Sequence, residues 1–136
     1  MLDQIKNRIE EVNKGRQEKT KKKIYKNILS NRLRWAKEND IILRDMEWMI
    51  LNALGKECKY CGEILLGDNI GLDHKVPINR KGTRDSANVH FICRKCNIRK
   101  GELTDREYRH ILSSIKSFSP RATKYILSKL SSRTYY

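Results

Sequence analysis

The first third of the chain alternates apolar and polar residues with a helical period. In residues 21–37 one face of a helix would be apolar and the other basic. The apolar face would carry Ile24, Tyr25, Ile28, Leu29, Leu33 and Ala36, and the basic face Lys23, Lys26, Arg34 and Lys37. We predict an amphipathic helix whose basic face is either solvated or in contact with a nucleic-acid backbone.

Further helices are predicted on both sides of a middle segment that has no sustained period. Residues 1–14 form a thin apolar stripe that ends before Gly15, and residues 44–54 form a stronger stripe with Gly55 at its end. Trp35 and Trp48 are expected to pack in the core or between elements rather than to stack on bases. Near the other end, residues 104–107 fit a capping box, and Ser119-Pro120 starts a helix that runs to about residue 130.

The middle segment contains all four cysteines, as two C-x2-C pairs, Cys58/Cys61 and Cys93/Cys96. Two such turns that face each other offer four thiolates in the tetrahedral arrangement that zinc accepts. Disulfides are the alternative, but a reducing compartment disfavours them. A closed four-cysteine site is structural, so any chemistry must lie elsewhere.

The net charge of the chain favours a polyanionic partner. The 136 residues carry 30 Lys and Arg against 16 Asp and Glu, a formal net charge of +14 that is spread along the chain. Nucleic acid is the commonest polyanion that neutralises such an excess, although charge alone does not exclude a membrane surface. The chain has no apolar run long enough to span a bilayer and no secretory signal at its start, so we expect a soluble, cytoplasmic protein.

Between the cysteine pairs, Asp73 and His74 are adjacent. Aspartate suits a hard metal ion, and histidine titrates near neutral pH and so suits a general base. In a strand the two side chains would point to opposite faces, so only a bend or a strand end lets both serve one site. Taken by itself, such a pair is more often a partner in a surface salt bridge.

The order of motifs is more specific than the pair. The chain reads C-x2-C, then LDHKVP, then a loop with Gly82, then NVHFICRKCNIRKG. This order, over roughly residues 56–103, resembles the HNH endonuclease family. The resemblance implies an α+β, mostly helical fold, with a central ββα-metal module and helices at both ends. We expect three regions, 1–55, 56–103 and 104–136, in one compact domain.

The resemblance also assigns roles to residues. His74 would be the general base, Asp73 would bind a catalytic Mg²⁺ or Mn²⁺, and Asn88 would fix the loop between the strands. Asn97 occupies the position of the family's final histidine, which makes this an H-N-N variant in which the amide oxygen would bind the ion. Pro77 and Gly82 would shape the strand end and the loop. Contacts to nucleic acid are expected from Arg80, Lys81, Arg99 and Lys100.

The roles of two further histidines and the identity of a recognition helix are not assigned by the motifs. His90, on a predicted short strand, would either serve the metal site or pack in the interior or at the surface. His110 is expected at the surface. The role of a recognition helix cannot be given to any one segment, although residues 21–37 and 119–131 are candidates.

The implied reaction is metal-assisted hydrolysis of phosphodiester bonds in double-stranded DNA. One such site would nick, and a double-strand break would need a homodimer or two successive events. Small HNH proteins are similar to homing endonucleases, phage packaging-associated nickases and restriction enzymes alike. Two alternatives remain, a zinc-stabilised nucleic-acid-binding module without nuclease activity and an RNA-binding zinc-ribbon protein. We expect no membrane partner and no small-molecule substrate.

Overall fold

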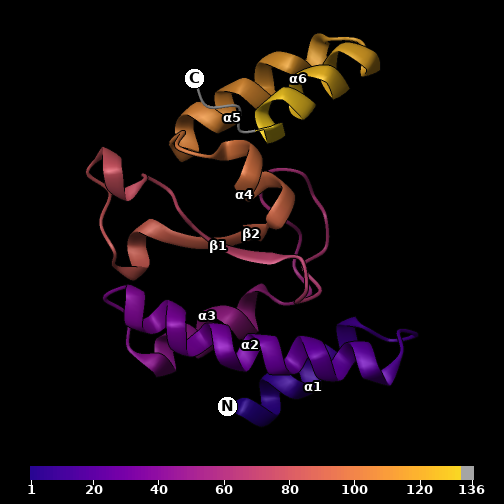
Figure 1. Ribbon diagram of the computed structural model, residues 1–136, viewed down its shortest axis with the longest axis vertical. Coiled ribbons are helices and arrows are strands. Elements are labelled where there is room, and N and C mark those ends of the chain that lie inside the picture. Colours follow the sequence, from indigo (N-terminus) through magenta and orange to yellow (C-terminus); the bar gives the residue numbers. More distant parts are fainter. Residues whose placement is uncertain (133–136) are drawn as a thin grey trace.

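The computed structural model describes residues 1–132 of the chain. Over this range the fold is mostly helical with one small antiparallel sheet, which confirms the predicted α+β class (Figure 1). The elements are α1 (Leu2–Val12), α2 (Glu18–Glu38), α3 (Leu43–Ala53), β1 (Ile70–His74), β2 (Val89–Cys93), α4 (Arg94–Lys100), α5 (Asp105–Ser114) and α6 (Pro120–Ser132). Three short 3-10 helices are η1 (Ile78–Arg80), η2 (Ser86–Asn88) and η3 (Ile115–Ser117).

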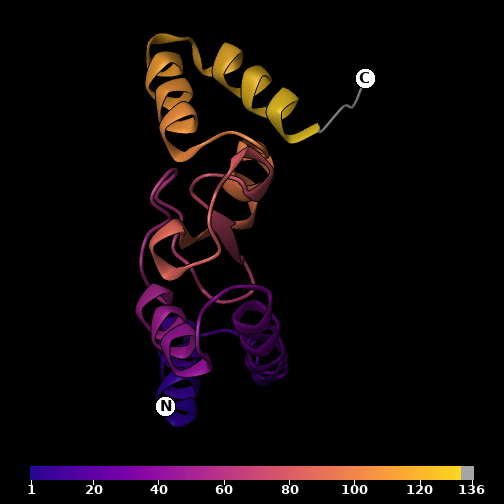
Figure 2. The same ribbon diagram turned by 90° about the vertical axis from the view of Figure 1, so that its left-hand side faces the viewer.

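The molecule is elongated, and its elements follow chain order along the long axis. Helices α1, α2 and α3 lie at one end, the sheet with α4 in the middle, and α5 and α6 at the other end (Figures 1 and 2). One cluster of buried residues nevertheless extends from Ile5 in α1 to Tyr108 in α5. The middle region is therefore packed against the helices rather than tethered to them. In the part of the chain described, no helix is both long and apolar enough to cross a membrane.

The predicted amphipathic helix over 21–37 is confirmed as the core of α2. It buries Ile24, Ile28 and Trp35 at helical spacing. The Trp35 ring packs against Phe91 of β2, with ring centroids 5.1 Å apart. Trp48 does not pack in the core, because it is 44% exposed. Helix α3 buries Met46, Glu47, Ile50 and Leu51. Trp48 lies between these residues in the sequence, but its side chain is not on the buried face of the helix.

Both predicted helix starts near the C-terminal end are confirmed. At α5 the Thr104 hydroxyl accepts from the Glu107 amide at 3.1 Å, and the Thr104 amide donates to the Glu107 carboxylate at 2.9 Å. This reciprocal pair satisfies backbone donors that the first helical turn leaves open. At α6 the Ser119 hydroxyl accepts from the Ala122 amide at 3.2 Å, and Pro120 is the first helical residue.

The two strands pair in a register that sorts the site residues between the sheet faces. Asp73 lies opposite His90, and His74 lies opposite Val89. Because side chains alternate along a strand, Asp73 and His90 share the face that α4 covers. His74 shares the other face with Phe91, which packs against α2. The expected opposition of Asp73 and His74 is thus present, and His74 is the last residue of β1.

Candidate active site and cysteine centre

The four cysteines come together in one cluster. Cys58 and Cys61 follow α3, Cys93 ends β2 and caps α4, and Cys96 lies in the first turn of α4. Their sulfur atoms all lie within 4.8 Å of one another. Cys58, Cys93 and Cys96 are buried and Cys61 is exposed, and all four are free thiols. The cluster is therefore positioned to form a metal site, and its donor set could bind zinc.

The hydrogen bonds around the cluster favour a thiolate at Cys58, whereas burial raises the pKa of Cys93 to about 12 and the hydrogen bond with Cys58 raises the pKa of Cys96. The Cys93 amide donates to the Cys58 sulfur and the Cys96 amide to the Cys93 sulfur, each at 3.4 Å. A hydrogen bond from the Cys96 thiol is the main cause that lowers the pKa of Cys58 to about 4. The thiolate is the form that binds a metal ion.

The loop between the strands is closed by the Asn88 side chain. Its amide nitrogen donates to the carbonyls of Val76 at 2.9 Å and Thr83 at 2.7 Å, and its oxygen accepts from the Val76 amide at 3.0 Å. This is the placement expected for the middle asparagine. Gly82 supports the same loop, because a Cβ built on it would lie 1.8 Å from the Val76 carbonyl oxygen.

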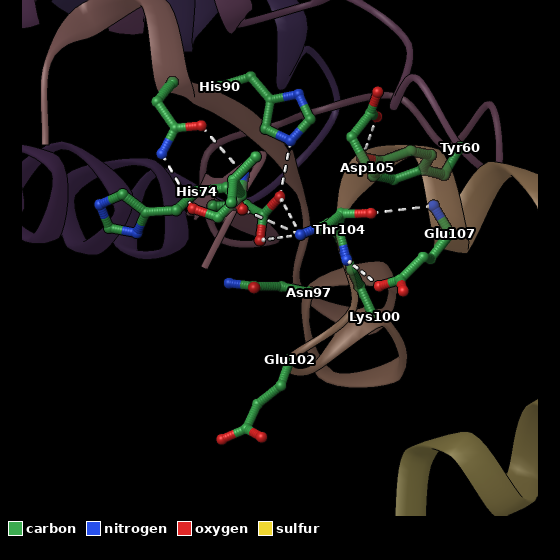
Figure 3. Close-up of polar contacts among 12 residues, drawn as sticks. Tyr60, His74, His90, Asn97, Lys100, Glu102, Thr104, Asp105 and Glu107 are labelled. Atoms are coloured by element: carbon green, nitrogen blue, oxygen red, sulfur yellow. Dashed lines mark hydrogen bonds and ion pairs between the residues drawn. The ribbon is translucent and has the colours of Figure 1, made fainter. Parts of the chain in front are cut away.

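Two buried side chains, His90 and Lys100, hold the Asp73 carboxylate, and both are labelled in Figure 3. His90 Nε2 donates to Asp73 Oδ2 at 2.7 Å, and Lys100 Nζ lies 3.2 Å from each carboxylate oxygen. All three side chains are at least 90% buried. A buried carboxylate needs such partners, because a charge removed from water is otherwise costly.

Lys100 does not lie where a phosphate contact was expected. It is 1% exposed, and its ammonium also donates to the His74 carbonyl at 2.9 Å. Residue 100 ends α4 on the face turned to β1, so the side chain spans the interior instead of reaching solvent. The expectation for Lys100 is corrected: it stabilises the strand that carries Asp73 and His74.

His74 points to the opposite side, toward the end of α2. Its Nε2 lies 2.8 Å from Oδ1 of Asn39, the C-cap residue of α2. Partial burial is the main cause that lowers the pKa of His74 below its usual 6.5, and the positive charges of Arg84 and Lys100 act in the same direction against the opposing charge of Asp73. The imidazole is therefore neutral at neutral pH.

Asn97 comes from α4 and lies against β1. Its amide nitrogen donates to the Leu72 carbonyl at 3.4 Å, and a Cβ built on Gly71 would lie 2.9 Å from that nitrogen. A glycine at position 71 thus lets Asn97 approach the strand. With the nitrogen turned to β1, the side-chain oxygen is left for a ligand.

A cleft of about 400 Å³ lies beside β1. Its lining includes Asp73, His74 and Asn97, together with Asn79, Pro77 and Glu102. The labelled side chains of His74, Asn97 and Glu102 lie around one region of Figure 3. Because His74 is the last residue of β1, the adjacent Asp73 and His74 can border one cleft although their side chains leave the strand on opposite faces.

The side chains at this cleft fit a hard divalent ion. Asp73 supplies carboxylate oxygens and Asn97 an amide oxygen, which are ligand types that Mg²⁺ and Mn²⁺ take. Asp73 would share its carboxylate between the ion, His90 and Lys100. A carboxylate has about four acceptor positions, so this sharing is chemically possible.

The other three residues that were expected to contact nucleic acid differ in their surroundings. The Arg80 guanidinium pairs with Glu107 and also donates to the Glu102 carbonyl at 3.3 Å. Arg99 donates to the Ser131 hydroxyl of α6 at 3.2 Å. Lys81 is exposed in the loop after η1. Of the four expected contact residues, Arg80 and Lys81 are exposed, Arg99 is half-buried and Lys100 is buried.

Comparison with known proteins gives a family match over part of the chain. Residues 58–103 match the model of the HNH endonuclease family. These residues, the HNH module, contain the cysteine cluster, both strands and α4, and they agree with the resemblance expected over residues 56–103. The match supports a nuclease-type or nucleic-acid-binding function. No curated protein matched the chain.

Three residues around the site were missed from the sequence. Asn39 carries no motif and lies outside the HNH module. Tyr60, within the first cysteine pair, donates its hydroxyl to Asp105 at 2.5 Å and packs edge-on against His90, with centroids 5.7 Å apart. Glu102 lines the cleft and accepts from Asn79 at 2.9 Å. Of these three residues, Tyr60 alone had a local signal in the sequence, its position between Cys58 and Cys61.

Proposed function

We propose that this protein is a divalent-metal-dependent HNH endonuclease that hydrolyses phosphodiester bonds in double-stranded DNA. The observation that carries the proposal is the cleft beside β1, which His74, Asp73 and Asn97 border together. These are a base and two oxygen ligands, the groups that the reaction needs. His74 and Asp73 come from the end of β1, and Asn97 comes from α4, whose first turn carries Cys96 of the cysteine cluster.

His74 would act as the general base. Its lowered pKa keeps the imidazole neutral at neutral pH, so it can accept a proton from a water molecule that attacks phosphorus in line with the leaving oxygen. The proton then resides on the His74 ring. The leaving 3′ oxygen would take a proton from solvent water, so the products would carry a 5′ phosphate and a 3′ hydroxyl.

Asp73 and Asn97 would hold a Mg²⁺ or Mn²⁺ ion. Such an ion, when bound, supplies electrostatic stabilisation of the charge that develops on the phosphate and on the leaving 3′ oxygen. His90 and Lys100 orient the Asp73 carboxylate from the protein side. Partners of this kind fix the direction of a metal ligand and tune its basicity.

Zinc at the four cysteines would be structural. The cluster ties the turn after α3 to the junction of β2 and α4, and α4 carries Asn97 and Lys100. A four-thiolate site is closed to substrate, so zinc would act through folding alone.

The positive charge would hold the substrate. The net charge is +14, and residues 58–104 carry only +4 of it, so most of the excess lies on the flanking helices. If about six phosphates are neutralised, the logarithm of the affinity should fall with the logarithm of salt concentration at a slope of about −5. Arg80, Lys81 and the basic face of α2 are accessible contact candidates.

One observation favours a second candidate, a zinc-stabilised nucleic-acid-binding module that does not cut. Both oxygens of Asp73 already have protein partners in His90 and Lys100. If these partners satisfied the carboxylate fully, the ion would not bind. An endonuclease would cleave DNA when a divalent ion is present, whereas a binding module would leave the DNA uncut under every divalent ion.

Incubation with supercoiled plasmid separates the candidates. We expect nicking with Mg²⁺ or Mn²⁺, none with chelator, and a loss of about 10²-fold or more in His74→Ala, since this is the range contributed by general acid–base catalysis. His110→Ala, a matched change on the exposed face of α5, should nick like the unchanged protein. DNA binding without nicking under every divalent ion would favour the binding module, and equal nicking by His74→Ala would indicate a contaminant.

A further inference from the structure

One residue outside the HNH module contacts the proposed base directly. Asn39 lies at the corner between α2 and α3, and its Oδ1 is 2.8 Å from His74 Nε2. The two residues are 35 positions apart in the chain. Asn39 is 7% exposed, so water does not compete freely for this contact.

The orientation of the Asn39 amide is determined by its other contact. Its Nδ2 donates to the Trp35 carbonyl at 2.8 Å. A carbonyl oxygen can only accept, so the nitrogen of the amide must face Trp35 and the oxygen must face His74. The assignment of oxygen and nitrogen therefore follows from chemistry and not from the positions of the atoms alone.

The same reasoning extends to the imidazole ring. An amide oxygen can only accept, so His74 Nε2 must carry the hydrogen. In the neutral ring Nδ1 then holds the lone pair, and Nδ1 has no hydrogen-bond partner among residues 1–132. We propose that Asn39 is a positioning residue that holds His74 in the Nε2–H tautomer and leaves Nδ1 as the basic atom at the cleft.

The corner that carries Asn39 is itself anchored to the HNH module. The Asp40 amide donates to the Arg84 carbonyl at 2.9 Å, and the Arg84 guanidinium donates to the Glu38 carbonyl at 3.1 Å. Residues on both sides of Asn39 are thus bonded to the loop between the strands, which lies beside this corner (Figure 1). These bonds leave Asn39 little freedom to leave His74.

The inference gives the N-terminal helices a part in the reaction. It rests on the proposed function, since a base that is never used needs no defined tautomer. The HNH module alone would then lack the group that orients its base, and α1 to α3 would complete the site in addition to binding DNA.

The tautomer can be measured without any activity. In zinc-loaded protein labelled with ¹⁵N at histidine, long-range ¹H–¹⁵N correlation spectra above pH 7.5 distinguish a protonated from an unprotonated ring nitrogen. Only three histidines are present, and His74→Gln and His110→Gln assign the signals. We expect His74 to show an unprotonated Nδ1 and a protonated Nε2. A protonated Nδ1 in the unchanged protein would overturn the proposal, whether or not the protein cuts DNA.

Two variants separate positioning from helix capping. Asn39→Ala removes both contacts, whereas Asn39→Asp keeps an acceptor for Nε2–H and loses the donor to Trp35. We expect the two His74 ¹⁵N shifts to move toward each other in Asn39→Ala and to stay apart in Asn39→Asp. If Asn39→Asp instead behaves like Asn39→Ala, capping is the role of Asn39 and the proposal is wrong.

Asn13 offers a matched control. It is a buried C-cap asparagine of α1 whose Nδ2 donates to the carbonyl of Ile9 at 2.8 Å, as Asn39 donates to Trp35. Asn13→Ala should leave the His74 shifts unchanged. In plasmid nicking we expect Asn39→Ala to lower kcat roughly 10- to 100-fold at similar KM, as a misplaced base would, with substantial rescue in Asn39→Asp. An unchanged kcat in folded, active Asn39→Ala would refute the positioning role and leave the proposed function standing.

Discussion

His90 Nε2 donates to Asp73 Oδ2 at 2.7 Å across the two strands of the HNH module. The residues are a directly opposed pair in the register, and both are buried. Lys100 approaches the same carboxylate from α4. This arrangement holds the proposed metal ligand from inside the protein, and His90 is buried beside it rather than at the surface.

We expect His90→Gln to weaken the use of the divalent ion. The change removes the imidazole donor from Asp73, and loss of a partner of a metal ligand typically costs 10- to 100-fold in metal affinity or activity. Nicking rates measured against Mn²⁺ concentration should give a higher half-saturating concentration. The exposed His110→Gln is the control, and identical Mn²⁺ dependence in both variants would contradict the role of His90.

Lys100→Met should destabilise the fold. Removing one partner of a buried ion pair leaves an uncompensated charge, which costs about 3–5 kcal/mol, and the His74 carbonyl also loses its donor. Urea unfolding of the zinc-loaded protein measures this loss. Lys95→Met, on the exposed face of α4, should cost about 1 kcal/mol or less. A small effect of Lys100→Met on stability would instead fit a phosphate contact at the surface. The slope of log DNA affinity against log salt concentration would then be reduced by about one.

The acidic limb of the nicking rate should have its midpoint below pH 6.5. Cleavage needs neutral His74, and burial lowers the pKa of this group, so protonation and loss of rate occur only at lower pH than for an ordinary histidine. Single-turnover rates between pH 5 and 8.5 measure the midpoint. Arg84→Gln should raise it, because one positive charge that lowers the pKa of His74 is removed, whereas the exposed Arg121→Gln should not. A midpoint above 6.5 in the unchanged protein would contradict this reading.

Zinc and the catalytic ion should be separable. A zinc-specific chelator should unfold the HNH module and lower Tm, since the four thiolates join the turn after α3 to the start of α4. Removal of Mg²⁺ alone should stop nicking and leave Tm almost unchanged. Elemental analysis should give one zinc per chain. Cys61→Ser should reduce that content, and a full zinc content with normal Tm in this variant would argue against a four-cysteine site.

Gly71→Ala should displace Asn97. A Cβ at position 71 would lie 2.9 Å from the Asn97 amide nitrogen, which is closer than real contacts allow. The Asn97 amide is the end of a flexible side chain and can shift, so we expect lower nicking activity with only a small loss of stability. In an Asn97→Ser background the stability cost of Gly71→Ala should shrink, because the shorter side chain leaves room. Additive costs in the double variant would show that the two positions do not interact.

The sequence by itself determined the features that depend on residues close together in the chain. The helices follow from apolar spacing, and the starts of α5 and α6 follow from capping residues that bond three positions along the chain. The paired C-x2-C turns indicated a metal site, and the order of motifs around Asp73, His74 and Asn88 indicated the HNH module. These features depend on bonds and periods within a few residues, which a sequence displays directly.

Only the tertiary structure decided which side chains meet. The contacts of His74 with Asn39, of Asp73 with His90 and of Asp73 with Lys100 join residues 35, 17 and 27 positions apart. They depend on the strand register, on the packing of α4 against β1 and on the position of the α2–α3 corner. Lysine at residue 100 reads as a surface residue until a buried carboxylate is found beside it, and Asn39 reads as a helix end until a histidine is found there. Burial and partnership are properties of the folded chain, and they determine the chemistry of these groups.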